Sequence, residues 1–240
     1  IISDVHANIT ALNAVLSDIR KRGISRIFCL GDSVAKCTHP DLVIDALRES
    51  CEVIILGNSD YSICRPEVKD RHFWTRDKIG EERANFIYNS PISYEFYMSG
   101  HLVRMFHASP FDLDSIYNPM FCNKGTSFKG KELNSPDELF YNTSFLGKTE
   151  NDPIPDIVCF GHIHTPCIVR FKNKTILNPG SVGIPVEMLN QSQDLDSISF
   201  QLVRIPYDIE KEIHDLEVSD MPSRDMIIRS LKGALPTTYN

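Results

Sequence analysis

The 240-residue sequence has no apolar run long enough to cross a membrane and no long run of Lys or Arg. A bilayer-spanning helix needs about 20 consecutive apolar residues, and the longest apolar runs here are far shorter. With a formal net charge of -7, sequence-independent binding to nucleic acid is not expected. No basic stretch followed by an apolar stretch marks a signal peptide. The chain begins within an expected strand, so the sequence leaves open whether residues precede Ile1.

The sequence also lacks the motifs of several hydrolase classes. It contains no Cys-x5-Arg loop, no GxSxG and no P-loop, which argues against a covalent phosphatase, a serine hydrolase or an NTPase of the common types. Its 7 cysteines are odd in number and form no CxxC pair. This pattern favours buried, reduced thiols over disulfides and predicts a reducing, cytoplasmic compartment.

Strand and helix patterns alternate in the first part of the chain. Helical spacing and apolar runs predict helices over residues 9–22, 41–50 and 74–89, and strands over residues 27–30 and 53–56. Gly23 is expected to end the first helix. This alternation is typical of a parallel sheet covered by helices.

The later part of the chain is richer in antiparallel patterns. We expect hairpins over residues 93–107 and 168–177, a strand within 197–205, and helices over 208–216 and 224–231. A two-sheet α/β core covered by helices fits this order better than one doubly wound sheet. Residues 111–155 show little periodicity, which is typical of a functional loop. The prediction is one domain over residues 1–240 with a cap-like insertion at about 111–155.

Polar residues of metal-binding types follow five short apolar runs. A short apolar run ended by turn residues indicates a buried strand, and open α/β sheets place their sites at the carboxyl ends of strands. The residues are Asp4, His6, Asp32, Asn58, His107, His162 and His164. Each motif alone occurs often by chance, but their joint occurrence predicts a metal site.

The chemistry of these seven residues favours two metal ions. Oxygen and imidazole donors without thiolates suit Mn, Fe, Zn or Ni ions, and seven donors are too many for one four-coordinate ion. Two ions that share a carboxylate fit the set. Because alternate residues of a strand face the same side, Asp4 and His6 are expected to reach one ion together.

These motifs resemble those of the calcineurin-like metallophosphoesterase superfamily. SDxHxN begins at Ser3, and GD, GNSD, His107 and GHxH follow in order, with a loop at Asn178 that resembles an NPGS motif. Within the superfamily the chain is most similar to the small prokaryotic phosphodiesterase-like branch. The resemblance implies a four-layer α/β/β/α sandwich, that is, two mixed sheets flanked by helices.

The resemblance also implies how the donors are shared between two divalent ions, with Mn favoured. Asp4, His6 and His164 would hold the first ion. Asn58, His107 and His162 would hold the second, and Asp32 would bridge the two.

The implied reaction is hydrolysis of a small phosphodiester or phosphoester by a metal-bridged hydroxide, with Asp32 and Asn58 as catalytic residues. A nucleotide-like substrate is left open. A phosphomonoesterase or a dinucleoside polyphosphate hydrolase is the alternative on the same site. A non-catalytic scaffold is disfavoured because no ligand position is lost. A homo-oligomer is left open as well.

One position departs from the family pattern. Many members carry His after the Asn, where it protonates the leaving group, whereas this chain has Ser59. Because a serine hydroxyl is a weak acid, we expect a preference for good leaving groups, or an acid from elsewhere such as His39.

The resemblance and the loops suggest four substrate contacts. They are Asn8, Ser59, Ser109 and Ser181. For Asn8 an N-cap of the first helix is the alternative.

Overall fold

The computed structural model describes residues 1–117, 131–185, 192–195 and 198–233. In the described part the α-helices are α1 (Ile9–Lys21), α2 (Pro40–Ser50), α3 (Asn58–Cys64), α4 (Phe73–Tyr88), α5 (Ile209–Val218) and α6 (Arg224–Gly233). The strands are β1 (Phe28–Cys29), β2 (Val53–Ile54), β3 (Ser93–Met98), β4 (His101–Phe106), β5 (Ile157–Cys159), β6 (Cys167–Phe171), β7 (Lys174–Asn178), β8 (Ser192–Leu195) and β9 (Ile198–Gln201). Short 3-10 helices are η1 (Asp70–His72), η2 (Pro136–Phe140) and η3 (Ser144–Leu146).

The first part of the chain forms the predicted parallel β-α-β unit. The Asn8 side chain accepts a hydrogen bond from the Ala11 backbone N–H and caps α1, and Gly23 follows the helix with φ +68°. β1 and β2 pair in parallel, and Ile2 bridges to Cys29 in parallel beside them. The expected helices and the strands at 27–30 and 53–56 are present, with shorter strands, whereas the strand expected at the start of the chain is reduced to the isolated bridge at Ile2. α3 was not predicted, because it begins at Asn58 itself.

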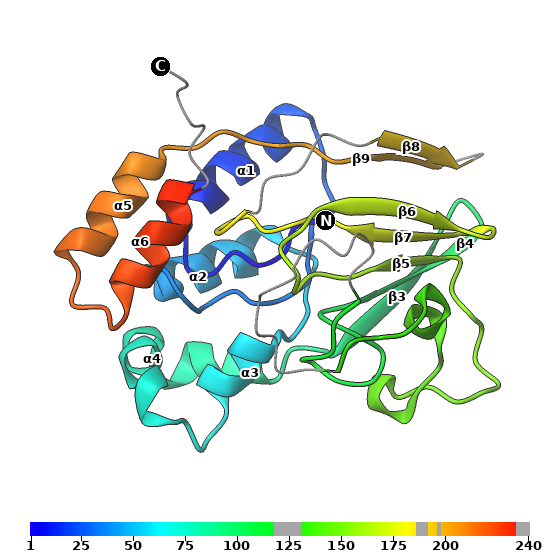
Figure 1. The fold of residues 1–240 in the computed structure, drawn as a ribbon, viewed down its shortest axis with the longest axis horizontal. Coiled ribbons are helices and arrows are strands. Elements are labelled where there is room, and N and C mark those ends of the chain that lie inside the picture. Colours follow the sequence, from blue (N-terminus) through cyan, green and yellow to red (C-terminus); the bar gives the residue numbers. More distant parts are fainter. Residues whose placement is uncertain (118–130, 186–191, 196–197, 234–240) are drawn as a thin grey trace.

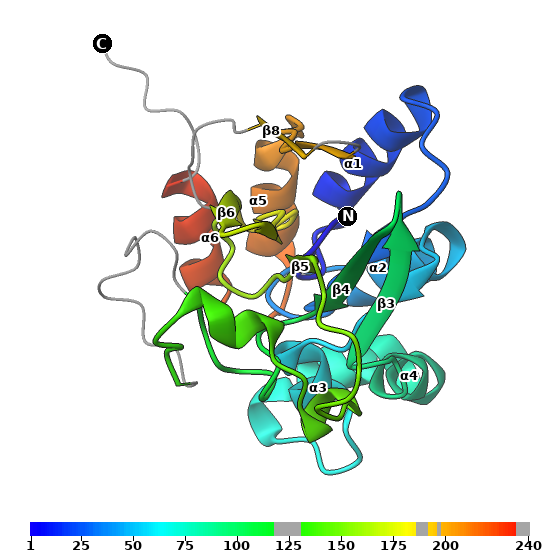
Figure 2. The ribbon, with the colours of Figure 1, turned by 90° about the vertical axis from the view of Figure 1, so that its right-hand side faces the viewer.

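Strands β3 to β7 form a second, mixed sheet with the order β3-β4-β5-β7-β6, and β8 and β9 pair antiparallel in a sheet of their own. β4, β5 and β7 run parallel, and hairpins add β3 and β6 antiparallel at the edges. Figure 1 shows this sheet beside the helices α1 and α2, and Figure 2 shows α3 and α4 together at one end. We expected two mixed sheets, but in the described residues β1 and β2 are parallel.

Three hydrophobic clusters follow one another across the structure. The first packs α1, α2 and α4 against β1 and β2, through residues such as Leu12, Ile44 and Ile79. The second lies between β1–β2 and the mixed sheet and is continued by Ile198 and Phe200 of β9. The third covers the far face of the mixed sheet with residues of the 131–146 region.

A buried arginine of the mixed sheet forms hydrogen bonds with part of the expected cap. Arg104 of β4 is fully buried and donates to Glu95 of β3, to Asn142 and to the Tyr141 carbonyl. The segment at 136–140 is a 3-10 helix, where a short helix was expected. Residues 118–130 of the predicted cap lie outside the described residues, so the cap itself stays a prediction.

Two further expectations concern membranes and thiols. None of the described helices has the length and apolar character needed to span a bilayer. The six cysteines in the described part of the chain are free thiols, and five of them are buried.

Candidate metal centre

Five of the predicted ligands have a left-handed backbone. Asp4, His6, Asp32, His162 and His164 have φ between 50° and 66°. This region is uncommon for residues other than glycine, and such strain concentrates at functional sites. The prediction that Asp4 and His6 alternate along an extended strand was therefore wrong. They reach the same side because the chain turns at each of them.

One carboxylate oxygen of Asp4 accepts hydrogen bonds from neighbouring residues, and the other faces the histidines. Its Oδ2 accepts hydrogen bonds from Ser3 Oγ at 2.6 Å and from the His162 backbone N–H at 3.0 Å. Its Oδ1 is buried without a hydrogen bond and lies 3.4 Å from His164 Nε2 and 3.8 Å from His6 Nε2. Burial opposes ionisation, but the charge of His164, its close polar contact with Asp4 and the charges of His107 and His6 together outweigh it and lower the pKa of Asp4.

His6 and His164 point ring nitrogens at the same place. Their Nε2 atoms are 2.9 Å apart. His164 Nδ1 lies 3.0 Å from the Ile184 carbonyl oxygen, to which it donates, so the lone pair is on Nε2. Burial, followed by the charge of Lys36, lowers the pKa of His6 well below its ordinary value. Neutral imidazole is the form that binds metals.

Asp32 lies between the two histidine groups. Its Oδ2 is 3.8 Å from His6 Nε2, and its Oδ1 is 3.5 Å from His107 Nε2. The Ser59 backbone N–H and hydroxyl donate to the two oxygens of Asp32, each at 2.8 Å. The Asp32 carboxylate therefore directs one oxygen towards His6 and the other towards His107.

His107, Asn58 and His162 form the other side of the cluster. His107 Nδ1 lies 2.8 Å from the Leu30 carbonyl, to which it donates, and its Nε2 is 3.0 Å from Asn58 Oδ1. The rings of His107 and His162 meet edge to face, with centroids 5.2 Å apart. The charges of Asp32 and Asp4 overcome burial and raise the pKa of His107, whereas burial and the charge of His107 lower that of His162 to about 4.

These residues fit a metal centre. Donor atoms of Asp4, His6 and the half-buried His164 form one compact group, and buried donor atoms of Asp4, Asp32 and His107 form another. The buried Asp4 Oδ1 and His6 Nδ1 have no hydrogen-bond partner, and a buried polar atom without a partner is costly. Lone pairs of neutral imidazoles that face one another and a carboxylate are complementary to a cation between them.

Close backbone packing brings the two ligand loops together. A Cβ atom on Gly57 would overlap the backbone and side chain of Asp32, and one on Gly31 would overlap the Gly57 backbone. Asp60, fully buried in α3, accepts hydrogen bonds from the Ser33 and Gly57 backbone N–H groups. Burial and the charge of Asp32 raise the pKa of Asp60 to about 7.

A family model for the calcineurin-like phosphoesterase superfamily domain matches residues 1–194. The chain belongs to this superfamily. The predicted resemblance is thereby confirmed, and the loops that carry Asp4 and His164 both lie within the matched residues.

Similar proteins cover nearly the whole chain. Uncharacterized protein MJ0912 of Methanocaldococcus jannaschii is 29% identical over 234 residues, which is 92% of this chain and 93% of that protein. The crystal structure of a metallophosphoesterase from Sphaerobacter thermophilus aligns with TM-score 0.69 at 20% identity over 98% of both chains. That of hypothetical protein PH1004 from Pyrococcus horikoshii OT3 aligns with TM-score 0.68 at 17% identity, over 96% of this chain and 95% of the other. The structural likeness shows a shared fold.

Three of the four residues predicted to contact substrate make side-chain hydrogen bonds to the backbone of the protein. Asn8 is fully buried, and its Nδ2 donates to the Gly183 carbonyl and to Tyr207 Oη while its Oδ1 caps α1. Ser109 is buried and its hydroxyl accepts from the Phe111 and Asp112 N–H groups. Ser181 donates to the Asp4 carbonyl. The predicted helix cap at Asn8 is confirmed, and its contact with substrate stays a prediction.

Two further predicted residues also have partners within the fold. The hydroxyl of Ser59 donates to Asp32. His39 Nε2 lies 3.4 Å from Asp215 Oδ2 of α5. The contacts described for His39 do not include a predicted ligand, and its role as a general acid stays a prediction.

Sequence patterns missed several side chains that contact the ligands. Lys36 Nζ lies 3.0 Å from His6 Nε2, and Asp114 accepts a hydrogen bond from Asn58 Nδ2 at 3.1 Å. Ser3 is adjacent to Asp4 in the SDxHxN motif and could have been predicted from it. Neither Lys36 nor Asp114 is marked by a motif, because only the folded loops bring them to the ligands.

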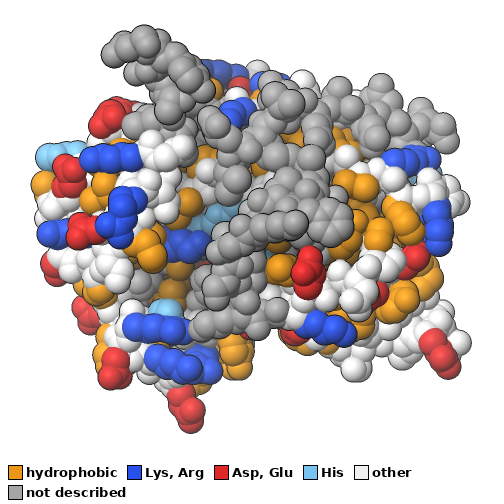
Figure 3. Space-filling view, viewed as in Figure 1, with side chains coloured by type: hydrophobic (Ala, Val, Ile, Leu, Met, Phe, Trp, Pro, Cys, Tyr) orange, Lys and Arg blue, Asp and Glu red, His pale blue; other side chains and the backbone are white. Residues whose placement is uncertain are grey.

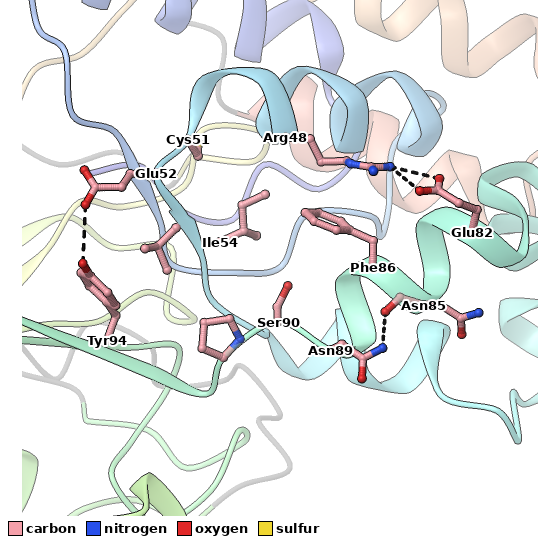
Figure 4. A pocket seen from close by; sticks show the side chains of 12 residues that line it. Arg48, Cys51, Glu52, Ile54, Glu82, Asn85, Phe86, Asn89, Ser90 and Tyr94 are labelled. Atoms are coloured by element: carbon pink, nitrogen blue, oxygen red, sulfur yellow. Dashed lines mark hydrogen bonds and ion pairs between the residues drawn. The ribbon is translucent and has the colours of Figure 1, made fainter.

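One groove in the described residues lies away from the predicted ligands. It has a volume of about 750 Å³ and lies between β2, α2, α4 and the start of β3, as Figure 4 shows. Glu52 and Glu82 in it are ion-paired with Arg26 and Arg48, and none of its lining residues is a predicted ligand. On the face drawn in Figure 3, histidine and basic side chains adjoin one another between the helices and the sheet.

Proposed function

We propose that this protein is a metal-dependent phosphoesterase that hydrolyses small phosphodiesters or other small phosphoesters. The observation that carries the proposal is the buried cluster in which Asp4 Oδ1 and the Nε2 atoms of His6 and His164 face one another, with Asp32 beside them. Membership of the phosphoesterase superfamily supports the same chemistry.

The residues present would hold two divalent cations. Asp4, His6 and His164 would bind the first, and Asn58, His107 and His162 the second, with Asp32 between them. When bound, such ions supply an activated water and neutralise charge on a phosphoryl group. Oxygen and nitrogen donors accept Mn, Fe, Zn or Ni, and Mn is our first choice.

The chain's own residues set the geometry for this chemistry. Hydrogen bonds from Ser59 hold both oxygens of Asp32, and the carbonyls of Leu30 and Ile184 orient the rings of His107 and His164. Such outer contacts fix ring orientation and tautomer. Ser59 stands where many relatives have an imidazole, so we propose a preference for esters with good leaving groups.

Two features of the architecture belong to the same proposal. The three successive hydrophobic clusters support a four-layer α/β/β/α sandwich, with the 131–146 region covering the outer face of the mixed sheet. We also propose that residues 1–240 form a single domain with a cap at about 111–155.

The test is reconstitution of metal-stripped protein with Mn²⁺, followed by assays with bis(p-nitrophenyl) phosphate and p-nitrophenyl phosphate. We expect turnover that Asp32→Asn abolishes, together with loss of bound metal. The control is Asp77→Asn, which removes the same charge from an exposed site on α4. If Mn, Fe, Zn and Ni all bind and neither ester is hydrolysed, a non-catalytic scaffold replaces the proposal.

A further inference from the structure

Lys36 places a cation inside the ligand cluster. Its Nζ lies 3.0 Å from His6 Nε2, and its charge interacts favourably with those of Asp32 and Asp4. The side chain is half-buried. A lysine head group is normally in water, so its position among predicted metal ligands requires an explanation.

The backbone around Lys36 is held close to the segment that carries His6. Its φ is +78°, a left-handed conformation that is strained for a long side chain. On either side, the loop is bonded to the first ligand segment. The Ala7 N–H donates to the Ser33 carbonyl at 2.7 Å, and the Cys37 N–H donates to the His6 carbonyl at 2.9 Å. These bonds hold the backbone on both sides of Lys36 next to the segment that carries His6.

The contact between Lys36 and His6 is incompatible with the proposed metal centre. A nitrogen that binds a cation has no lone pair left for an ammonium group, and two positive charges at this distance repel each other. With ions in place, the ammonium group has to move away from His6 Nε2. The loop bonds nevertheless keep it at the edge of the site, where an anion on the substrate is the complementary partner.

We propose that Lys36 is a specificity-determining residue that binds a second negative charge on the substrate phosphoryl group. Lys36 would favour phosphate monoesters and terminal phosphates over diesters. The favoured groups are dianions, whereas a diester carries one negative charge. This inference rests on the proposed function and chooses among its substrates. A charge-assisted hydrogen bond to the extra charge corresponds to about 10- to 100-fold in binding.

The experiment compares wild type with Lys36→Met, Lys36→Arg and the control Lys21→Met, an exposed lysine at the end of α1. Each protein is loaded with Mn²⁺, and its metal content is measured. Values of kcat/KM are then determined for p-nitrophenyl phosphate and bis(p-nitrophenyl) phosphate. The two esters share a leaving group and differ in charge. Calorimetric titration with inorganic phosphate measures anion binding without turnover.

We expect Lys36→Met to lower kcat/KM for the monoester by about 10- to 100-fold and to change that for the diester much less. Phosphate affinity should fall in parallel, Lys36→Arg should retain most of both, and Lys21→Met should match wild type. Equal losses for both esters, or unchanged phosphate affinity in Lys36→Met, would overturn the inference. If wild type hydrolyses neither ester, the proposed function fails, and the phosphate titration still decides whether Lys36 binds the anion.

Discussion

Removal of the Asp114 carboxylate should weaken binding of the second cation. Asp114 Oδ1 accepts a hydrogen bond from Asn58 Nδ2 at 3.1 Å, and Asn58 Oδ1 lies 3.0 Å from His107 Nε2. An amide can present either its oxygen or its NH₂ group to a site, and only the oxygen binds a cation. Asp114 holds the NH₂ group and so keeps the oxygen directed at the ligand cluster.

The expected loss of cation affinity depends on how exposed the hydrogen bond between Asp114 and Asn58 is. Hydrogen bonds to charged groups contribute about 1.5–3 kcal/mol, but Asp114 is exposed and Asn58 is half-buried, so the low end applies. About 1.4 kcal/mol corresponds to a tenfold change in affinity, at the lower edge of the range for outer contacts of metal sites. The group of Asp4, His6 and His164 makes no described hydrogen bond to Asp114 and should keep its affinity.

The assay is calorimetric titration of Mn²⁺ into metal-free protein. For Asp114→Ala we expect one binding event unchanged and the other about tenfold weaker. Asp114→Asn retains an acceptor oxygen and should recover most of the loss. Asp77→Ala removes an exposed charge elsewhere and serves as the control. Two unchanged affinities in Asp114→Ala, or equal weakening of both, would refute the reasoning.

Three other predictions concern stability and leaving groups. Arg104→Met should lower the free energy of unfolding by about 1.5–3 kcal/mol, because Asn142 and the Tyr141 carbonyl lose their buried, charged donor, while Lys148 still pairs with Glu95; a loss below about 1 kcal/mol in urea unfolding would contradict this. Relative to a His162→Asn variant, metal-free wild type should lose stability as the pH falls from 6.5 towards 4. His162, with its pKa lowered to about 4, stays neutral when folded while the unfolded chain takes up the proton. Thermal unfolding across this range measures the effect, and His162→Asn should flatten it. Ser59→His should raise kcat/KM for alkyl esters by about 10² or more relative to nitrophenyl esters, and an equal change for both would argue against a missing acid.

Local patterns were enough to identify most elements and to name the candidate ligand residues that the fold brings together. Helical spacing predicted α1, α2 and α4 to within a residue or two of their ends, because amphipathic periodicity is a local property. The candidate ligands could be named because each follows an apolar run, as His107 follows β4. α3 escaped prediction because its first residue, Asn58, also suits a turn, and β8 has no apolar alternation.

The arrangement of the site was decided by tertiary contacts. Nothing local to His164 or His107 specifies which ring nitrogen carries the proton, since the carbonyls of Ile184 and Leu30 decide it. Lys36 and Asp114 reach the ligands only because loops distant in the sequence are bonded together, as the Cys37 N–H is to the His6 carbonyl.

The sequence by itself therefore determined which side chains are available for metal binding and in what order they occur along the chain. Only the folded structure showed that five of these residues have left-handed backbone angles, which of them face one another, and that the ammonium group of Lys36 lies beside them. The physical reason is that apolar periodicity acts over a few residues, whereas ring orientation and charge contacts depend on groups far apart in sequence.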